Sequence, residues 1–217
     1  MGHILLIILC IVAAYFIGSC NSAIIVVKLL KREDIRNFGS KNAGLTNVLR
    51  CFGKGPALAT LLSDLLKGLL TILLIKFIVS KSGYSGDIDA IGYISGFMVM
   101  LGHIFPVYYG FKGGKGVLLT ASVLLAIDVR TFAIVIPIFI VMLIITKYVS
   151  LSSIVAAVSY PIVTFFMQYF VEKIPMNTVI LHTALVCLST LLIVYMHRSN
   201  IERLKNGTEN KFSFSKK

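Results

Sequence analysis

Three short polar stretches of the chain carry the residue types that bind phosphate groups. They are GSKNAGLTN (residues 39–47), GHIFPVYYGFKGGKG (102–116) and HRSNIERLKNGTE (197–209). Phosphate binding uses clustered backbone N–H groups and cations, and glycine lets the main chain approach an anion without a Cβ in the way. One such stretch is a weak signal. Three stretches at one membrane face predict a site for anionic substrates beside lipid.

The second stretch contains the strongest single phosphate-binding pattern. Its segment Lys112–Gly116 reads KGGKG and directly precedes an expected helix, whose positive N-terminal dipole would attract an anion. It is not a Walker A loop, because Gly110 to Lys115 spells GxxxGK, one residue short, and Gly116 stands where Ser or Thr would bind magnesium. The alternative interpretation is a flexible basic turn at a membrane surface.

The first stretch supplies hydroxyl and amide groups, from Ser40, Asn42 and Asn47, and is followed by Arg50. Such groups can donate to a phosphate or a substrate hydroxyl, and a guanidinium can bind a phosphate through two N–H groups. A helix-capping loop is the alternative, since Ser and Asn are preferred cap residues.

Two further sets of polar residues lie within or at the ends of apolar runs. Asp64 and Lys67 are three residues apart and face the same side of an expected helix. Charges in an apolar run are costly unless they face a polar cavity or each other, so this pair either contacts substrate or forms a structural ion pair. His103 lies at the expected end of the third helix, just before Pro106, where it either contacts substrate or caps its own helix.

The composition identifies the medium in which these residues must be positioned. With 57% apolar residues, 14% charged residues and a mean hydropathy of +0.91, the 217-residue chain cannot be an ordinary water-soluble domain. The first apolar run, Ile4 to Val27, has no charge in 24 residues, enough to cross a hydrocarbon core of about 30 Å. It lacks a preceding basic segment and is expected to be a retained helix. The later apolar runs are residues 55–79, 88–109, 117–127, 131–146, 151–171 and 177–196.

Charge distribution decides how the 11-residue run at 117–127 is interpreted. As a helix it measures about 17 Å, so it either crosses alone or continues into the next run. With seven crossings, sixteen lysines and arginines fall on one side and four on the other, which places the richer side in the cytoplasm. Fusing the two runs would bury Asp128 and Arg130 in the membrane. We therefore predict an all-α integral membrane protein with seven transmembrane helices, the N-terminus outside and the C-terminus cytoplasmic, and residues 1–217 forming a single domain.

Several classes of partner are not expected. The net charge of +12 is explained by cytoplasmic loops near anionic lipid headgroups, and the basic residues are spread over short loops without a nucleic-acid-binding module. The cysteines at 10, 20, 51 and 187 form no CxxC and no His/Cys cluster, so neither a disulfide nor a metal is predicted.

The stretches GSKNAGLTNVLR, SDLLKG, LGHIFPVYYGFKGGKG and HRSNIERLKNGTE, in this order between apolar helices, resemble the bacterial acyl-phosphate:glycerol-3-phosphate acyltransferase family, PlsY. The resemblance covers nearly the whole chain. It implies an enzyme of the cell inner membrane, with its active site facing the cytoplasm and no cofactor. The implied reaction moves an acyl chain from acyl phosphate to the 1-hydroxyl of glycerol 3-phosphate and gives lysophosphatidic acid and phosphate. The enzyme that makes acyl phosphate is an expected partner, besides membrane lipid.

The resemblance also suggests individual site residues. Ser40 and His197 are the candidate catalytic residues. The candidate substrate-binding residues are Asn42, Asn47, Arg50, Lys67, His103, Lys112, Gly113, Gly114, Lys115, Gly116, Asn200, Arg203 and Glu209. The segments Gly18–Ser22 and Val117–Thr120 depart from the usual family pattern, which leaves the shape of the acyl pocket open.

The residues and the implied reaction agree physically. Acyl phosphate has a good leaving group, so an enzyme mainly needs to position two anions and stabilise an oxyanion. Neither a GxSxG elbow nor an HxxxxD motif is present. No carboxylate–histidine pair is evident, so the leaving phosphate is the favoured proton acceptor, with His197 and Ser40 as alternatives. A transporter of a phosphorylated solute and a seven-helix receptor are the competing classes, but the polar residues cluster at one face and no inverted repeat is detected.

Overall fold

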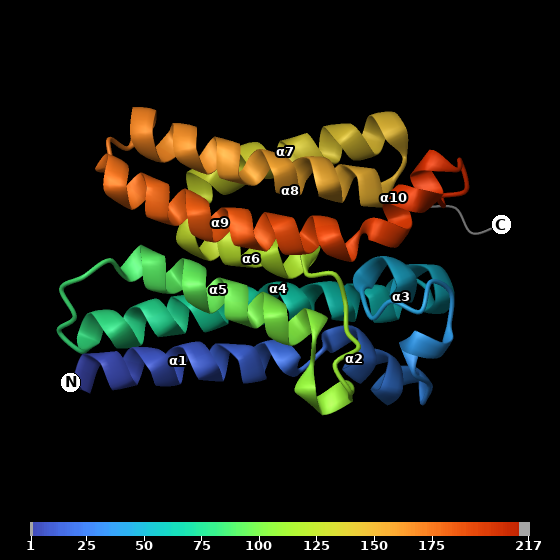
Figure 1. Ribbon diagram of the computed structural model, residues 1–217. Helices are drawn as coiled ribbons and strands as arrows, with labels where there is room; N and C mark the ends of the chain where they lie inside the picture. The colour runs from blue at the N-terminus through green and yellow to red at the C-terminus, as the bar shows by residue number, and fades with distance from the viewer. Residues whose placement is uncertain (1, 213–217) are drawn as a thin grey trace. The chain divides into compact units, whose positions relative to one another are not determined.

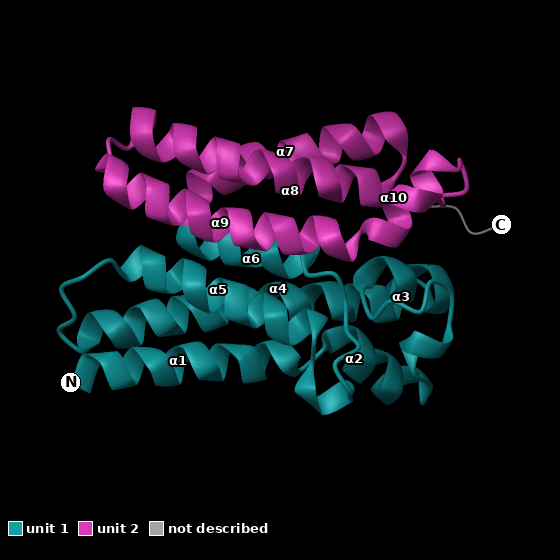
Figure 2. Ribbon diagram, viewed as in Figure 1, with its two compact units in different colours: residues 1–127 teal, residues 128–217 magenta. Residues whose placement is uncertain are grey.

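The protein is helical throughout the part that the structure, a computed structural model, describes. Residues 2–212 are described, and their regular elements are all helices (Figure 1). The chain divides into two compact units, Met1–Ile127 (unit 1) and Asp128–Lys217 (unit 2), shown in different colours in Figure 2. The organisation of both units as a single domain stays a prediction.

Unit 1 is built around three long helices. Its α-helices are α1 (Gly2–Ser19), α2 (Ser22–Lys31), α3 (Leu45–Phe52), α4 (Lys54–Lys81), α5 (Ile88–Ile104) and α6 (Val117–Ile127), with 3₁₀ turns η1 (Ile35–Asn37) and η2 (Val107–Tyr109). Helix α4 packs against α1, α5 and α6, and α1 packs against α5. The short helices α2 and α3 and the turn η2 lie at one end of the unit, and the α4–α5 connection lies at the other (Figure 1).

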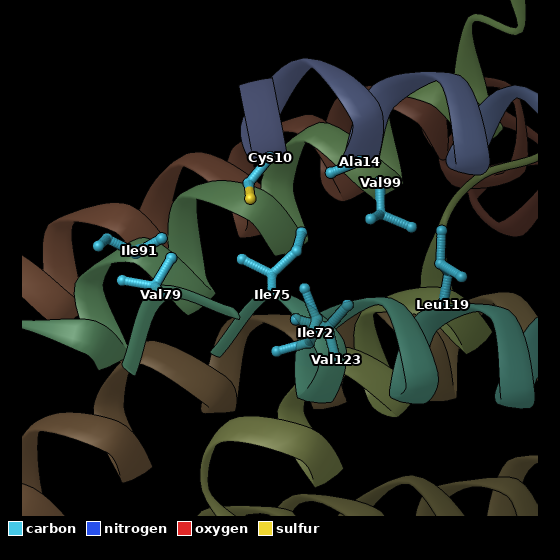
Figure 3. Close-up of a cluster of buried hydrophobic side chains, with 9 residues drawn as sticks. All are labelled: Cys10, Ala14, Ile72, Ile75, Val79, Ile91, Val99, Leu119 and Val123. Atoms are coloured by element: carbon cyan, nitrogen blue, oxygen red, sulfur yellow. The ribbon is translucent and has the colours of Figure 1, made fainter. Parts of the chain in front are cut away.

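The core of unit 1 is formed by nine buried residues from α1, α4, α5 and α6, drawn in Figure 3. Close helix contact supplements this packing at Gly102, where an added Cβ would lie 2.1 Å from the Tyr15 carbonyl oxygen of α1. Small residues that let backbones approach are the usual means of packing helices in lipid, because lipid is as apolar as a leucine side chain. Helices α1 and α5 are therefore fixed side by side.

The first apolar run is not the single helix that its hydropathy predicts. Helix α1 ends at Ser19, and α2 begins at Ser22 after Asn21, whose backbone is extended. The Asn21 side chain accepts a hydrogen bond from the Ile24 N–H at 3.1 Å, which caps a new helix. The apolar pattern would allow one continuous helix. The chain starts a new helix at Ser22 because the Asn21 amide gives a buried N–H group at the helix N-terminus a hydrogen-bond partner.

Unit 2 contains three long helices, each connected to the next by a short segment, and a short terminal helix. It contains α7 (Val129–Thr146), α8 (Val149–Phe166), the π-helical turn η3 (Met167–Val171), α9 (Met176–Met196) and α10 (Arg198–Lys205). Helix α8 packs against both α7 and α9, and α10 contacts α8 and α9. Asp128 caps α7 by accepting from the Thr131 N–H at 2.9 Å, so the apolar runs at 117–127 and 131–146 are separate helices.

The helices have the character of membrane spans. Six are long and apolar enough to cross a membrane, and Val117–Ile127 is a shorter apolar helix. Large apolar side chains are exposed along α4 and α7, among them Leu62, Leu66, Leu70, Ile144 and Ile145. Such exposure suits lipid and not water. The chain is an integral membrane protein, whereas seven crossings and the orientation of the termini remain predictions.

Candidate active site

The first polar stretch is held in shape by one buried amide. The Asn47 side chain, at the start of α3, donates through Nδ2 to the carbonyl oxygens of Phe38 at 3.0 Å and Asn42 at 3.1 Å. Its Oδ1 accepts from the Ser40 N–H at 3.0 Å. Asn47 is 2% exposed. These contacts make it the organiser of the loop, while a direct contact with substrate stays a prediction.

The glycine loop of the second stretch lies against the C-terminal end of α5. The Gly113 N–H donates to the Ile104 carbonyl at 3.0 Å, and the Gly114 N–H donates to the His103 carbonyl at 3.1 Å. A Cβ at Gly114 would lie 2.2 Å from His103 Nε2 and 2.8 Å from the Ala43 carbonyl oxygen. The expectation that glycine allows approach to an anion needs correction here, because these two N–H groups bind α5 and the close approach is to protein.

Main-chain contacts join the first and second stretches. The Ala43 N–H donates to the Gly113 carbonyl oxygen at 3.3 Å. Asn21 Nδ2 lies 3.3 Å from the Ala43 carbonyl oxygen and 3.4 Å from that of His103, and its side chain is fully buried. Two of the three predicted stretches therefore meet within unit 1. Asn21 was not predicted as part of this arrangement, although it stands in a segment that departs from the family pattern.

Around these fixed groups, other candidate side chains are accessible. Ser40, Arg50 and Lys112 are exposed, and Asn42 and Lys115 are partly buried. Hydroxyl, amide, guanidinium and ammonium groups of this kind are donors for a phosphate. Unit 1 thus presents donors on a rigid arrangement of loops, and their contact with substrate stays a prediction.

A charged cluster lies beneath the loops. Lys67 Nζ is 3.2 Å from Asp64 Oδ1 and donates to the carbonyl oxygens of Gly18 at 3.3 Å and Cys20 at 3.0 Å. The two hydrogen bonds to carbonyl oxygens show Lys67 holding the end of α1. His103 Nδ1 is 3.6 Å from Asp64 Oδ1. The two groups are neighbours without a hydrogen bond, so the expectation that no histidine is oriented by a carboxylate stays a prediction.

A hydrogen bond from Arg36 connects the segment after α2 to the segment after α5. Arg36 donates to Asp34 at 2.7 Å through Nη2 and to the Tyr109 carbonyl oxygen at 2.7 Å through Nη1. The hydrogen bonds from the Arg36 side chain hold the pKa of Asp34 below its ordinary value. Sequence reasoning missed this contact, although Asp34 and Arg36 are two residues apart.

In unit 2 the third stretch is organised by Glu209. Its carboxylate accepts hydrogen bonds from Asn200 Nδ2 at 2.7 Å, Arg203 Nε at 2.6 Å and Ser150 Oγ at 2.8 Å. Burial would raise the pKa of Glu209, but its three hydrogen bonds outweigh burial and hold the pKa below the ordinary value. The side chain of Arg203 remains 36% exposed. Ser150, at the start of α8, was missed because it lies 59 residues from Glu209.

His197 is oriented by its own helix. Its Nδ1 is 2.8 Å from the Ile193 carbonyl oxygen, and the residue is 3% exposed. A carbonyl oxygen can only accept, so Nδ1 carries the hydrogen, and in the neutral ring Nε2 then has the lone pair.

The fold defines an all-α integral membrane protein with clusters of polar and charged side chains in each unit, and comparison with known proteins assigns its family. Residues 8–207 match the sequence model of the family described as glycerol-3-phosphate acyltransferase. The chain is 37% identical to the glycerol-3-phosphate acyltransferase of Chlorobaculum tepidum, covering 95% of this chain and 97% of that one. It is 38% identical to that of Clostridioides difficile, covering 94% and 95%.

Solved structures agree with this assignment. The crystal structure of PlsY (YgiH), an integral membrane glycerol 3-phosphate acyltransferase, in its glycerol 3-phosphate form has a TM-score of 0.79 at 32% identity and covers 95% of this chain and 96% of that one. The lysophosphatidic acid form has a TM-score of 0.77 at 30% identity, with 95% of each chain covered. The chain belongs to the glycerol-3-phosphate acyltransferase family, which confirms the family predicted from the sequence motifs.

Proposed function

We propose that this chain transfers an acyl group from acyl phosphate to the 1-hydroxyl of glycerol 3-phosphate, releasing lysophosphatidic acid and inorganic phosphate. The observation that carries the proposal is the likeness, over 95% of the chain, to an acyltransferase solved in a glycerol 3-phosphate form and in a lysophosphatidic acid form. Those two molecules differ by one acyl group. They are therefore the acceptor and the product of such a transfer.

The reaction needs little covalent chemistry from the protein. The hydroxyl oxygen of glycerol 3-phosphate bonds to the acyl carbonyl carbon, the bond from that carbon to the phosphate oxygen breaks, and the hydroxyl proton goes to the leaving phosphate. Acyl phosphate is a mixed anhydride, so holding the two anions in line and stabilising the carbonyl oxygen supply most of the rate enhancement.

In unit 1 we assign phosphate binding to side chains and not to the glycine N–H groups. Arg50, Lys112 and Lys115 provide the positive charges, and Ser40 and Asn42 provide further donors near the same loops. The two loops are held together through Ala43 and Gly113, which supports their acting on the same substrate group. Gly116 permits the turn into α6, with a φ of +82°.

In unit 2 we assign Asn200 and Arg203 to anion binding, with Glu209 positioning both. His197, whose Nδ1 donates to the Ile193 carbonyl oxygen, is the second candidate proton acceptor after the leaving phosphate. We also propose that the protein has seven crossings in the cell inner membrane and acts at its cytoplasmic face, supported by the cation asymmetry of the loops.

The donor is tested with purified protein in detergent. Phosphate should be released from acyl phosphate only when glycerol 3-phosphate is present, and a chelator should leave the rate unchanged. Acyl-CoA and acyl carrier protein serve as comparison donors. A preference for either of them would overturn the acyl phosphate assignment.

Direct transfer predicts that no acyl-enzyme forms. Incubating the wild-type protein with acyl phosphate alone and measuring its intact mass should show the unmodified chain. A stable gain of one acyl chain on Ser40 would replace direct transfer with a two-step mechanism.

If cations hold the substrates, replacing Arg50, Lys115 or Arg203 by Ala should lower kcat/KM by about 10²-fold, at about 1.4 kcal/mol per tenfold. The exposed Lys205→Ala serves as a control. Equal effects of all four replacements would mean that general surface charge, and not these positions, is responsible.

The orientation is tested with single cysteines in a background lacking the four native ones. Ser82→Cys and Lys211→Cys should react with an impermeant reagent from opposite faces of the membrane. Reaction of both from one face would contradict seven crossings.

A further inference from the structure

Asp64 and His103 form a pair of titratable side chains that is almost completely buried. The Asp64 side chain on α4 is 2% exposed, and the His103 side chain on α5 is 5% exposed. Asp64 Oδ1 and His103 Nδ1 face each other at 3.6 Å, beyond hydrogen-bond distance. The proposed reaction does not yet use this pair, because the leaving phosphate takes the proton.

Both facing atoms lack a hydrogen bond of acceptable geometry. Asp64 Oδ1 and His103 Nδ1 are buried side-chain atoms without a hydrogen-bond partner. Lys67 lies 3.2 Å from the same oxygen, which gives charge attraction without hydrogen-bond alignment. A buried donor or acceptor without a hydrogen bond lowers the stability of the folded protein, because it has lost its bonds to water. A shift of a few tenths of an ångström would let Nδ1–H donate to Oδ1, and hydrogen bonds at such sites are often long until a ligand binds.

The other edge of the His103 ring faces the glycine loop. A Cβ at Gly114 would lie 2.2 Å from His103 Nε2, and the Gly114 N–H donates to the His103 carbonyl oxygen. The ring therefore lies between Asp64 and Gly114. A movement of the ring toward or away from Asp64 must move the loop or open a gap beside it, because the space next to Gly114 is filled.

Asp64 is surrounded by polar groups that have contacts of their own. The ammonium of Lys67 also donates to the Gly18 and Cys20 carbonyl oxygens. Ser22, at the start of α2, also hydrogen-bonds to the Asp64 carboxylate. Replacement of Asp64 therefore leaves the Lys67 ammonium with two hydrogen-bond acceptors.

We propose that Asp64 is a positioning residue of the phosphate-binding loop: it accepts a hydrogen bond from His103 Nδ1 and thereby fixes the ring against Gly114 when a substrate phosphate is bound at Lys112–Gly116. The proposal rests on the proposed function for its ligand. Asp64 acts through His103 and touches no substrate.

The kinetic test compares Asp64→Ala and Asp64→Asn with wild type. We expect Asp64→Ala to raise KM for one of the two phosphate substrates at least about tenfold while kcat changes less than about threefold. Asp64→Asn keeps an amide oxygen as acceptor and should recover part of the affinity. The control is Asp89→Ala, which removes another carboxylate between α4 and α5, paired with Lys76 at 2.6 Å, and should leave both KM values unchanged. Unchanged KM values in Asp64→Ala, or an equal rise in Asp89→Ala, would overturn the proposal.

Replacement of His103 tests the same contact from the other side. In His103→Asn the amide nitrogen takes about the place of Nδ1, so this variant should bind substrate better than His103→Ala. If Asp64→Ala fails to fold, these two variants still decide between the outcomes. Equal KM values for Asn and Ala at position 103 would contradict a role for the Nδ1–Asp64 contact.

Hydrogen exchange separates this proposal from the proposed function. The amides of Gly113 and Gly114 should exchange at least about tenfold faster in Asp64→Ala than in wild type, and at the wild-type rate in Asp89→Ala. This measurement needs no turnover. Absence of acyl transfer by wild type would end the proposed function alone, whereas equal exchange rates in all three proteins would end the positioning role alone.

Discussion

The two units hold their candidate residues by different means. In unit 1 the contacts are mainly to the backbone: Asn47 bonds to loop carbonyl oxygens, and Gly113 and Gly114 donate to the end of α5. In unit 2 three side chains converge on the single carboxylate of Glu209. An arrangement fixed by backbone contacts is sensitive to added volume, and one fixed by a carboxylate is sensitive to loss of charge.

The two units should therefore be sensitive to different substitutions. In unit 1 an extra methyl group at a backbone contact must displace the main chain. In unit 2 the shape of Glu209 can be kept while its charge is removed. The amide then has one acceptor oxygen for the three donors, and its NH2 group accepts no hydrogen bond. The predictions below test this contrast.

The largest effect is expected for Gly114→Ala. The new Cβ would meet His103 Nε2 and the Ala43 carbonyl oxygen, and a misplacement of about 1 Å in such a loop costs about 10²-fold in rate. We expect kcat/KM to fall by at least about 10²-fold in the acyl-transfer assay.

The matched control is Gly55→Ala on α4, where nothing lies within 4 Å of the added Cβ. Alanine is the better helix former, so this variant should keep its activity and its Tm should not fall. Similar activity losses in both variants would refute the steric explanation for the glycine loop.

A smaller effect is expected for Glu209→Gln, which keeps the shape and removes the charge. Hydrogen bonds to charged groups contribute more than neutral ones, so we expect the free energy of unfolding to fall by about 1–2 kcal/mol. Asn200 and Arg203 bond to different carboxylate oxygens, and the amide keeps only one acceptor oxygen, so one of the two contacts is lost and kcat/KM should fall about tenfold. Glu202→Gln, at an exposed position on α10, should change neither quantity, and a neutral Glu209→Gln would disprove the organising role of the carboxylate.

The smallest effect is a pH dependence of the same carboxylate. The hydrogen bonds of Glu209 hold its pKa below the ordinary value of about 4.3. The stability that it contributes is thus present above pH of about 4.3 and is lost as pH falls through the lowered pKa of the folded state. The Tm difference between wild type and Glu209→Gln should be constant from pH 6 to 8 and shrink below about pH 4. A difference that grows on acidification would reverse the assigned direction of the pKa shift.

Asp34 in unit 1 is a second carboxylate with a lowered pKa, and it can be compared with Glu209 in unit 2. Its pKa is also lowered, by the hydrogen bond from Arg36, but its side chain is 29% exposed against 9% for Glu209. Solvent screens the exposed pair more strongly. Asp34→Asn should therefore change Tm less than Glu209→Gln does at pH 7.

The amino-acid sequence by itself determined the medium, the helices and the family. Apolar runs at 55–79, 117–127 and 177–196 correspond to α4, α6 and α9 within two residues, because a helix in lipid must satisfy its backbone internally and therefore needs a continuous apolar segment. The three polar stretches identified the acyltransferase family because their order and composition are local properties of the chain. Only the break at Asn21 departed from this pattern in the first run, since a capping side chain is a weak signal within apolar sequence.

The tertiary structure decided which polar groups meet. It directed the Gly113 and Gly114 N–H groups to α5, placed His103 between Asp64 and Gly114, and brought Ser150 to Glu209. Each of these pairings depends on which helix faces pack together. Hydropathy records only that a residue is apolar or polar, whereas a hydrogen bond requires a donor and an acceptor to arrive within about 3 Å in a suitable direction. That geometry is set by packing contacts distributed over the whole unit.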